Sequence, residues 1–217
     1  MNSIPINADY LRALTHISAK ADIRYYLNGV FVDIRARETR YIASNGHMLA
    51  VIRDEARAED ADQVPARYII PFATCKTAHS HKGVMAVLHY NAADQLARCT
   101  IDNLAKDGVL AFTPIDGKYP DFARVVPSKV DGKPGAYNWS YLDAFDRMAA
   151  IAWPVGKNSK PLSVELYQNG AEGAALVLAG GREFLGVVMP VRNNAPGTSP
   201  VLPVWWAGEP AKLKAVA

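Results

Sequence analysis

The chain has 217 residues, of which 50% are hydrophobic and 21% charged, and its formal net charge is +3. This length and composition indicate a globular protein with one large domain or two small ones. No apolar run approaches the roughly 20 residues that cross a bilayer. Residues 1–7 lack the basic start and apolar core of a secretory signal, so we expect a cytoplasmic protein with no membrane partner.

The cysteines and the net charge limit the function classes only weakly. Cys75 and Cys99 stand alone without CxxC spacing, which favours buried free thiols in a reducing compartment. The mild positive charge permits contact with nucleic acid but does not argue for it, because solvated Lys and Arg side chains give the same sum.

The first elements follow from apolar periodicity and turn signals. After an extended stretch at residues 3–6, a helix is predicted over residues 6–21, beginning at the capping residue Asn7. Alternating β-branched and aromatic residues bounded by breakers then predict antiparallel strands. These strands are placed at residues 29–34, 40–43 and 48–52, with a hairpin turn at Asn45-Gly46.

The same order of elements recurs twice, which indicates an internal duplication and an α+β fold of repeated β-α-β-β-β units. The acidic stretch at residues 54–62 is predicted to be a solvated loop. The second unit is predicted as a strand at 67–70, a helix at 72–81 and strands at 84–90, 95–101 and 108–114. After a Lys/Gly/Pro-rich connector at 128–135, the third unit is predicted as a helix at 139–153 and strands at 162–166, 174–179 and 182–191.

Four stretches carry a resemblance to a known family, in the order that the family shows. They are RYYLNG with SNGHMLAV inside residues 22–52, IDGKYPDFARVVP at 115–127, NWSYL at 138–142 and VVMPVR at 187–192. Together they resemble the bacterial sliding clamp, the beta subunit of DNA polymerase III. The resemblance implies the DNA-clamp fold, with helices on one face of antiparallel sheets. It implies one complete clamp-like domain at residues 1–125, half a domain at 126–192, and a Pro-rich tail at 193–217 with no counterpart.

In that family, partner proteins dock a short linear peptide with apolar anchors in a cleft, and the resemblance implies such a cleft here. Its first wall would be Arg24, Tyr26, Leu27, Ser44, Gly46, His47, Leu49, Pro120, Arg124 and Val125. Its second wall would be Asn138, Tyr141, Val187, Val188, Met189, Pro190, Val191 and Arg192. Apolar side chains suit Leu or Phe anchors, and an adaptable Met suits varied partners. Leu49 and Val187 would equally be core residues in any sheet protein.

The chain departs from the family at several positions. Met48 stands where the family usually shows Arg, Ser44 where Thr is common, and the chain continues past Arg192. The segment VLPVWW at 201–206 is an apolar cluster on a tether. Two interpretations stay open: it occupies the cleft of its own or a neighbouring chain, or it packs on an exposed sheet or helix surface.

The resemblance also implies helices that face double-stranded DNA without sequence preference, through basic side chains. The candidates are Arg12, His16, Lys20, Lys76, His79, Lys82 and Arg147. Each could instead lie on a solvated helix face.

An enzyme is not expected. Cys75, His79 and His81 match no closed zinc set, and the chain shows no phosphate-binding glycine loop, nucleophile elbow or paired-carboxylate site. We therefore expect no cofactor and no metal. Two binding roles stay open: a processivity clamp that binds polymerase and clamp-loader-type peptides and encircles DNA as a homo-oligomer, or a clamp mimic that binds such peptides without encircling DNA.

Overall fold

The computed structural model describes residues 1–55, 63–80, 84–102, 108–155, 164–179 and 183–192. The predicted tail at 193–217, Lys82, His81 and most of the acidic stretch 54–62 lie outside these residues. None of the helices in the described ranges combines the length and the apolar content that crossing a bilayer requires.

The described elements repeat one order, and we name the repeats the first, second and third unit. The first unit is β1 (Asn2–Ile6), α1 (Ala8–Leu14), β2 (Gly29–Ile34), β3 (Glu38–Ser44) and β4 (Met48–Glu55). The second unit is β5 (Ala66–Pro71), α2 (Phe72–Thr77), β6 (Ala86–Tyr90), β7 (Cys99–Asp102) and β8 (Leu110–Phe112). The third unit is α3 (Trp139–Ala152), β9 (Val164–Tyr167), β10 (Ala175–Ala179) and β11 (Phe184–Val188). Short 3-10 turns lie at Tyr25–Leu27 and Phe122–Val125.

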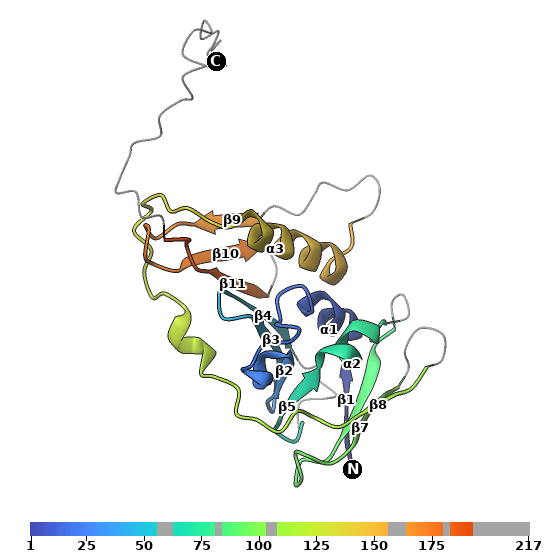
Figure 1. Ribbon diagram of the computed structural model, residues 1–217. Helices are drawn as coiled ribbons and strands as arrows, with labels where there is room; N and C mark the ends of the chain where they lie inside the picture. Colours follow the sequence, from blue (N-terminus) through green and yellow to red (C-terminus); the bar gives the residue numbers. More distant parts are fainter. Residues whose placement is uncertain (56–62, 81–83, 103–107, 156–163, 180–182, 193–217) are drawn as a thin grey trace, which may run out of the picture.

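The described strands form two antiparallel sheets, with the orders β1-β6-β7-β8 and β5-β2-β3-β4-β11-β10-β9. The longer sheet joins all three units, because β2 of the first unit pairs with β5 of the second, and β4 of the first pairs with β11 of the third. Figure 1 shows α3, α1 and α2 following one another along one side of this sheet, and α1 packs against both of the other helices. The α+β prediction with helices on one face is confirmed.

The longer sheet is buried on both faces at its centre, and this explains why the residues Met48–Ile52 are all apolar. Met48, Ala50 and Ile52 pack in the core on the helix side. Leu49 and Val51 pack on the other face, where the segment 115–126 crosses the sheet. Successive side chains of a strand point to opposite faces, so a strand covered on both sides reads as a continuous apolar run.

The helix boundaries correct the sequence prediction. The side chain of Asn7 caps α1 by accepting from the N–H of Asp9 at 3.0 Å, as predicted. The helix ends at Leu14, however, and not at residue 21, because the hydroxyl and N–H of Thr15 both bond the carbonyl of Arg12 and tighten the chain into turns. The buried Ile17 extends the apolar pattern beyond the helix. Likewise α2 ends at Thr77, while α3 matches its prediction to within one residue.

Several strands also differ from their predicted bounds. β3 and β4 are longer than predicted, because the outer end of the hairpin carries the ion pair of Glu38 with Arg53 in place of apolar residues. β7 begins only at Cys99, since turns around Asp94 occupy the residues before it. β11 ends at Val188, shortly before Pro190. No strand lies in residues 126–138, which are described throughout and lead into α3, so the third unit departs from the predicted β-α-β-β-β order.

Both cysteines are buried free thiols, as predicted. Burial raises the pKa of Cys75 to about 12 and that of Cys99 to about 11. Both thiols are therefore protonated at neutral pH and poorly reactive.

Candidate functional site

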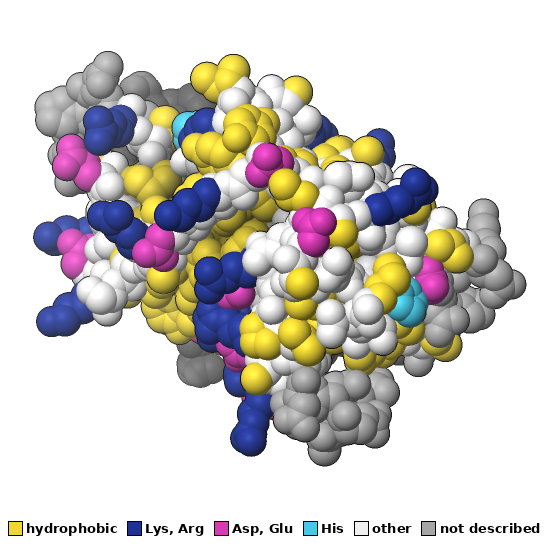
Figure 2. All heavy atoms as spheres, turned by 90° about the horizontal axis from the view of Figure 1, so that it is seen from below, with side chains coloured by type: hydrophobic (Ala, Val, Ile, Leu, Met, Phe, Trp, Pro, Cys, Tyr) yellow, Lys and Arg dark blue, Asp and Glu magenta, His cyan; other side chains and the backbone are white. Residues whose placement is uncertain are grey.

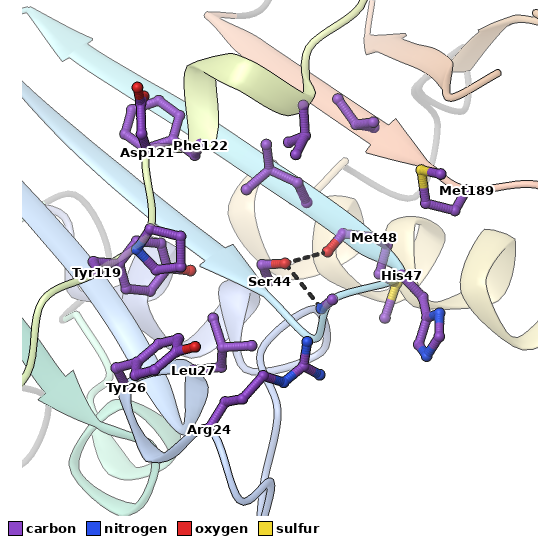
Figure 3. A pocket seen from close by; sticks show the side chains of 15 residues that line it. Arg24, Tyr26, Leu27, Ser44, His47, Met48, Tyr119, Asp121, Phe122 and Met189 are labelled. Atoms are coloured by element: carbon purple, nitrogen blue, oxygen red, sulfur yellow. Dashed lines mark hydrogen bonds between the residues drawn. The ribbon is translucent and has the colours of Figure 1, made fainter.

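A cavity of about 220 Å³ lies on the outer face of the longer sheet, where the turn between β3 and β4, the strand β11 and the segment 119–125 meet (Figure 3). Most of its lining is apolar. The predicted cleft residues that line it are Arg24, Tyr26, Leu27, Ser44, Gly46, His47, Leu49, Pro120, Val125, Val187 and Met189.

Strand pairing positions the floor of this cavity. Leu49 of β4 stands opposite Val187 of β11, and both side chains are almost fully buried. The pairing continues beyond the strand, since the N–H of Met189 donates to the carbonyl of His47 at 2.8 Å. Met189 itself stays 38% exposed at the rim, where a bound molecule could cover it.

The turn at one side of the cavity is held by its own polar groups. The hydroxyl of Ser44 donates to the carbonyl of Met48 at 2.8 Å and accepts from the N–H of Gly46 at 3.0 Å (Figure 3). The side chain of Asn45 accepts from the N–H groups of His47 and Met48. Gly46 has a φ of +87°, a conformation that favours glycine.

Arg24 is the charged group at this side of the cavity. Its guanidinium makes two bonds to Asp22, at 2.7 and 3.0 Å, and one to the carbonyl of Asn45 at 3.2 Å. The Arg24 side chain holds the pKa of Asp22 at about 2, and Asp22 in turn raises the pKa of Arg24. The guanidinium is therefore oriented and charged at neutral pH.

Tyr119 closes another side of the cavity. Its ring stacks on Phe31, with the ring centroids 4.7 Å apart and the planes 3° from parallel. Its hydroxyl is buried and has no hydrogen-bond partner among the described residues. Burial raises the pKa of Tyr119, so the hydroxyl remains a neutral donor.

The other predicted cleft residues do not line the cavity. Val188 follows Val187 in β11, so its side chain points to the helix-side core. Asn138 caps α3, and Tyr141 reaches the site only by stacking on His47, with ring centroids 5.7 Å apart. Arg124 is exposed on a 3-10 turn. The residues after Met189 lead away from the strand: Pro190, Val191 and Arg192.

Sequence reasoning missed four lining residues, Met48, Tyr119, Asp121 and Phe122. Tyr119, Asp121 and Phe122 belong to the same motif, 115–127, from which only Pro120, Arg124 and Val125 were assigned to the cleft. Membership in this motif was the signal in the sequence from which these three residues could have been assigned to the cleft. A 3-10 turn folds Phe122 back onto the sheet, and so short a turn has no apolar periodicity in the sequence that would predict it.

The predicted DNA-facing residues that the structure describes lie near the three helices, and three of them are paired with carboxylates. Asp9 contacts both Arg12, at 3.0 Å, and His79, at 2.8 Å. Arg147 pairs with Asp143 at 2.8 Å. On the face that Figure 2 draws, acidic side chains are likewise interspersed among Lys and Arg.

His16 and Lys20 were predicted to lie on the first helix, but α1 ends at Leu14 and both residues lie beyond it. Burial, with Arg147 and Lys20 as further causes, lowers the pKa of His16, so its ring is neutral at pH 7. The ammonium of Lys20 lies 5.9 Å from the centre of the Phe72 ring. Lys76 is exposed at α2. In the described ranges no group of three or more His, Cys, Asp or Glu side chains is placed to hold a metal ion.

Comparison with known proteins gives consistent relatives. A beta sliding clamp of Escherichia coli K12 is 30% identical over 159 residues, which cover 69% of this chain and 38% of the relative. A beta sliding clamp of Pseudomonas aeruginosa is 28% identical over 141 residues, covering 62% of this chain and 35% of the relative. The matched stretch thus spans little more than a third of these relatives. No protein-family profile matches the chain.

Solved structures show the same fold. The DNA polymerase III subunit beta of Pseudomonas aeruginosa superposes with a TM-score of 0.67 at 18% identity, covering 89% of this chain and 66% of that one. The beta subunit of Thermotoga maritima gives a TM-score of 0.63 at 13% identity, with 89% and 66% covered. At these identities the likeness shows the fold alone, and it confirms the clamp fold predicted from the sequence.

Proposed function

Because this chain belongs to the family of bacterial sliding clamps, we propose that it is a non-catalytic, clamp-like processivity factor of DNA replication in the cytoplasm. Its partners would be DNA polymerase and clamp-loader-type proteins, which dock short linear peptides in the cavity between β4, β11 and segment 119–125. We propose in addition that residues 1–125 form one complete clamp-like domain and residues 126–192 form half of a second one, followed by the tail at 193–217.

The apolar cavity is the observation that carries the proposal. Leu27, Leu49, Val187 and Met189 offer a surface for Leu or Phe anchors, and burying one such side chain contributes roughly 1.5–3 kcal/mol. Arg24 stands at the side with a fixed guanidinium that can hold a peptide carbonyl or carboxylate. A few apolar anchors with one oriented cation are typical of short-peptide recognition.

A fluorescence anisotropy titration tests this function. The probe is a labelled peptide of about six residues with one Leu and one Phe, and the control is the same peptide with both anchors replaced by Ala. We expect saturable binding of the first peptide and at least about tenfold weaker binding of the second, as the loss of two apolar anchors implies. Equal binding of the two peptides would contradict the proposal.

The second candidate function is a clamp mimic that binds the same peptides without encircling DNA, and the paired charges near the helices favour it. Arg12 and His79 are bound to Asp9, and Arg147 is bound to Asp143, so carboxylates compete with phosphates for three of the predicted DNA-facing side chains. Light scattering with and without primed DNA distinguishes the two. An encircling clamp gives an oligomer whose mass rises on DNA, whereas a mimic gives an unchanged mass.

A further inference from the structure

The tail at residues 193–217 begins close to the rim of the peptide cavity. Met189 lines that rim at the end of β11 (Figure 3), and the last residue before the tail, Arg192, follows three positions later (192 − 189). The N–H of Val191 donates to the carbonyl of Ala136 at 2.7 Å, which fixes the point where the tail starts. Any group near the start of the tail is therefore brought close to this site.

The tail carries one strongly apolar cluster, VLPVWW at residues 201–206. Exposure of this cluster to water is unfavourable, because burying one large apolar side chain contributes roughly 1.5–3 kcal/mol. The intervening residues 193–200 let the cluster lie up to about 30 Å from Arg192. The dipeptide Pro196-Gly197 among them is a turn signal, which favours reversal of the chain towards the cavity.

Two prolines favour a cavity over a sheet edge as the place where this cluster binds. Pro203 lies inside the cluster and Pro200 directly before it. Proline has no N–H to donate, so adding this segment as a strand to an open edge would forfeit ladder hydrogen bonds. A cavity that takes up side chains has no such requirement. The peptide cavity offers apolar surface at its rim, where Met189 is 38% and Val125 50% exposed.

We propose that residues 201–206 dock in the peptide cavity of their own chain and thereby compete with partner peptides. The inference rests on the proposed function, because it describes the regulation of that same site. A ligand joined to its site by a short linker has an effective concentration that is roughly millimolar. A partner peptide must therefore displace the tail, and the cavity selects for partners that bind tightly or are locally concentrated.

Cross-linking of the full chain tests the docking without any peptide. Ala207→Cys places a thiol directly after the intact cluster, and Val125→Cys places a second thiol at the cavity rim. In the control, Val64→Cys replaces Val125→Cys, since Val64 is 43% exposed and precedes β5, at the end of the longer sheet. Both native thiols are buried. With a short bis-maleimide, we expect the cavity pair to link within one chain at least about tenfold faster than the control pair.

An anisotropy titration with the Leu/Phe peptide measures the consequence for binding. The double variant Trp205→Ser/Trp206→Ser removes the two largest side chains of the cluster. Its control, Leu213→Ser/Val216→Ser, removes two apolar side chains from the same tail outside the cluster. We expect the first variant to bind the peptide at least about tenfold more tightly than the wild type, because its competitor has lost two apolar anchors. The control should bind like the wild type.

Cavity variants weaken the tail and the peptide alike. The chain with Trp205→Ser/Trp206→Ser, in which the tail competes least, is therefore also the chain in which their effect on peptide affinity is largest.

The outcomes separate tail docking from the proposed function. Equal linking rates of the two cysteine pairs, or equal peptide affinities of Trp205→Ser/Trp206→Ser and the wild type, would overturn tail docking and leave the peptide site in place. Links between two chains, seen as a denatured species of twice 23.6 kDa, would overturn it as well, because the cavity would then hold a neighbour's tail. Preferential linking of the cavity pair without peptide binding by any variant would support tail docking and contradict the proposed function.

Discussion

Leu49 of β4 and Val187 of β11 are direct neighbours in antiparallel register, although 138 positions separate them in the sequence (187 − 49). Their side chains lie on the outer face of the sheet and form part of one cavity. The candidate site therefore exists only because the first and third units share a sheet. Changes that loosen the junction of β4 with β11 should weaken peptide binding even when they lie outside the cavity.

Gly46→Ala tests the turn beside the cavity. A Cβ at this position would lie 2.5 Å from Nη1 of Arg24, and the φ of +87° disfavours any L side chain. We expect a loss of stability of about 1–2 kcal/mol, with Arg24 displaced from Asp22 and weaker peptide binding. Urea denaturation and the peptide titration measure the two effects. Gly132→Ala is the control, because that glycine has a φ of +73° but no neighbour within 4 Å. Equal peptide affinity in the two variants would contradict the role of Arg24.

Gly186→Ala tests the packing of α3 on β11, the strand that pairs with β4. A Cβ on Gly186 would lie 2.8 Å from the ring of Phe145 and 2.9 Å from the Cβ of Val177. The second neighbour is close to the backbone and cannot swing away, so we expect a destabilisation of about 1–3 kcal/mol. Thermal or urea unfolding of the purified variant measures it. Wild-type stability would show that the sheet and α3 are not packed this closely.

Tyr119→Phe separates stability from binding. The buried hydroxyl has no partner among the described residues, so its removal should leave the free energy of unfolding unchanged or raise it by roughly 1 kcal/mol. If a bound peptide supplies an acceptor, such as a backbone carbonyl, the same variant should bind more weakly by about threefold to tenfold. A marked loss of stability would instead mean that the hydroxyl is satisfied in the free protein.

The ion pair of Asp22 with Arg24 predicts a pH dependence. The pKa of Asp22 lies at about 2 in the folded protein, below its usual 3.8, because of the bonds from Arg24. The unfolded chain then binds more protons than the folded one between these values, so the contribution of Asp22 is fully present above pH 4 and is lost as the pH falls towards 2. A carboxyl NMR titration measures this pKa directly, and Arg24→Gln should return it towards 3.8. A wild-type midpoint near 4 would contradict the pairing.

Local patterns predicted part of this fold well. The bounds of β2 agree because alternation and flanking breakers are local signals, and α3 agrees because its apolar face spans the whole helix. The early ends of α1 and α2 were missed, since Thr15 and Thr77 bond helix carbonyls through their hydroxyls, which no apolar period reveals.

The candidate site was predicted less completely, for two physical reasons. The pairing of β4 with β11 joins distant segments, so only the family resemblance indicated it. Within a matched motif, the pleat of the strand decides which residues face the cavity: Val187 does and Val188 does not. The 3-10 turn around Phe122 added lining residues that the carried-over set did not contain.

The most direct test of the central claim is the affinity of the Leu/Phe peptide for Met189→Asp, compared with Val84→Asp. Met189 is 38% exposed at the cavity rim and Val84 is 43% exposed before β6, outside the cavity, so both variants should fold. The account predicts at least about tenfold weaker binding by Met189→Asp and wild-type binding by Val84→Asp. Equal affinity of both variants and the wild type would show that the cavity between β4 and β11 is not the peptide site.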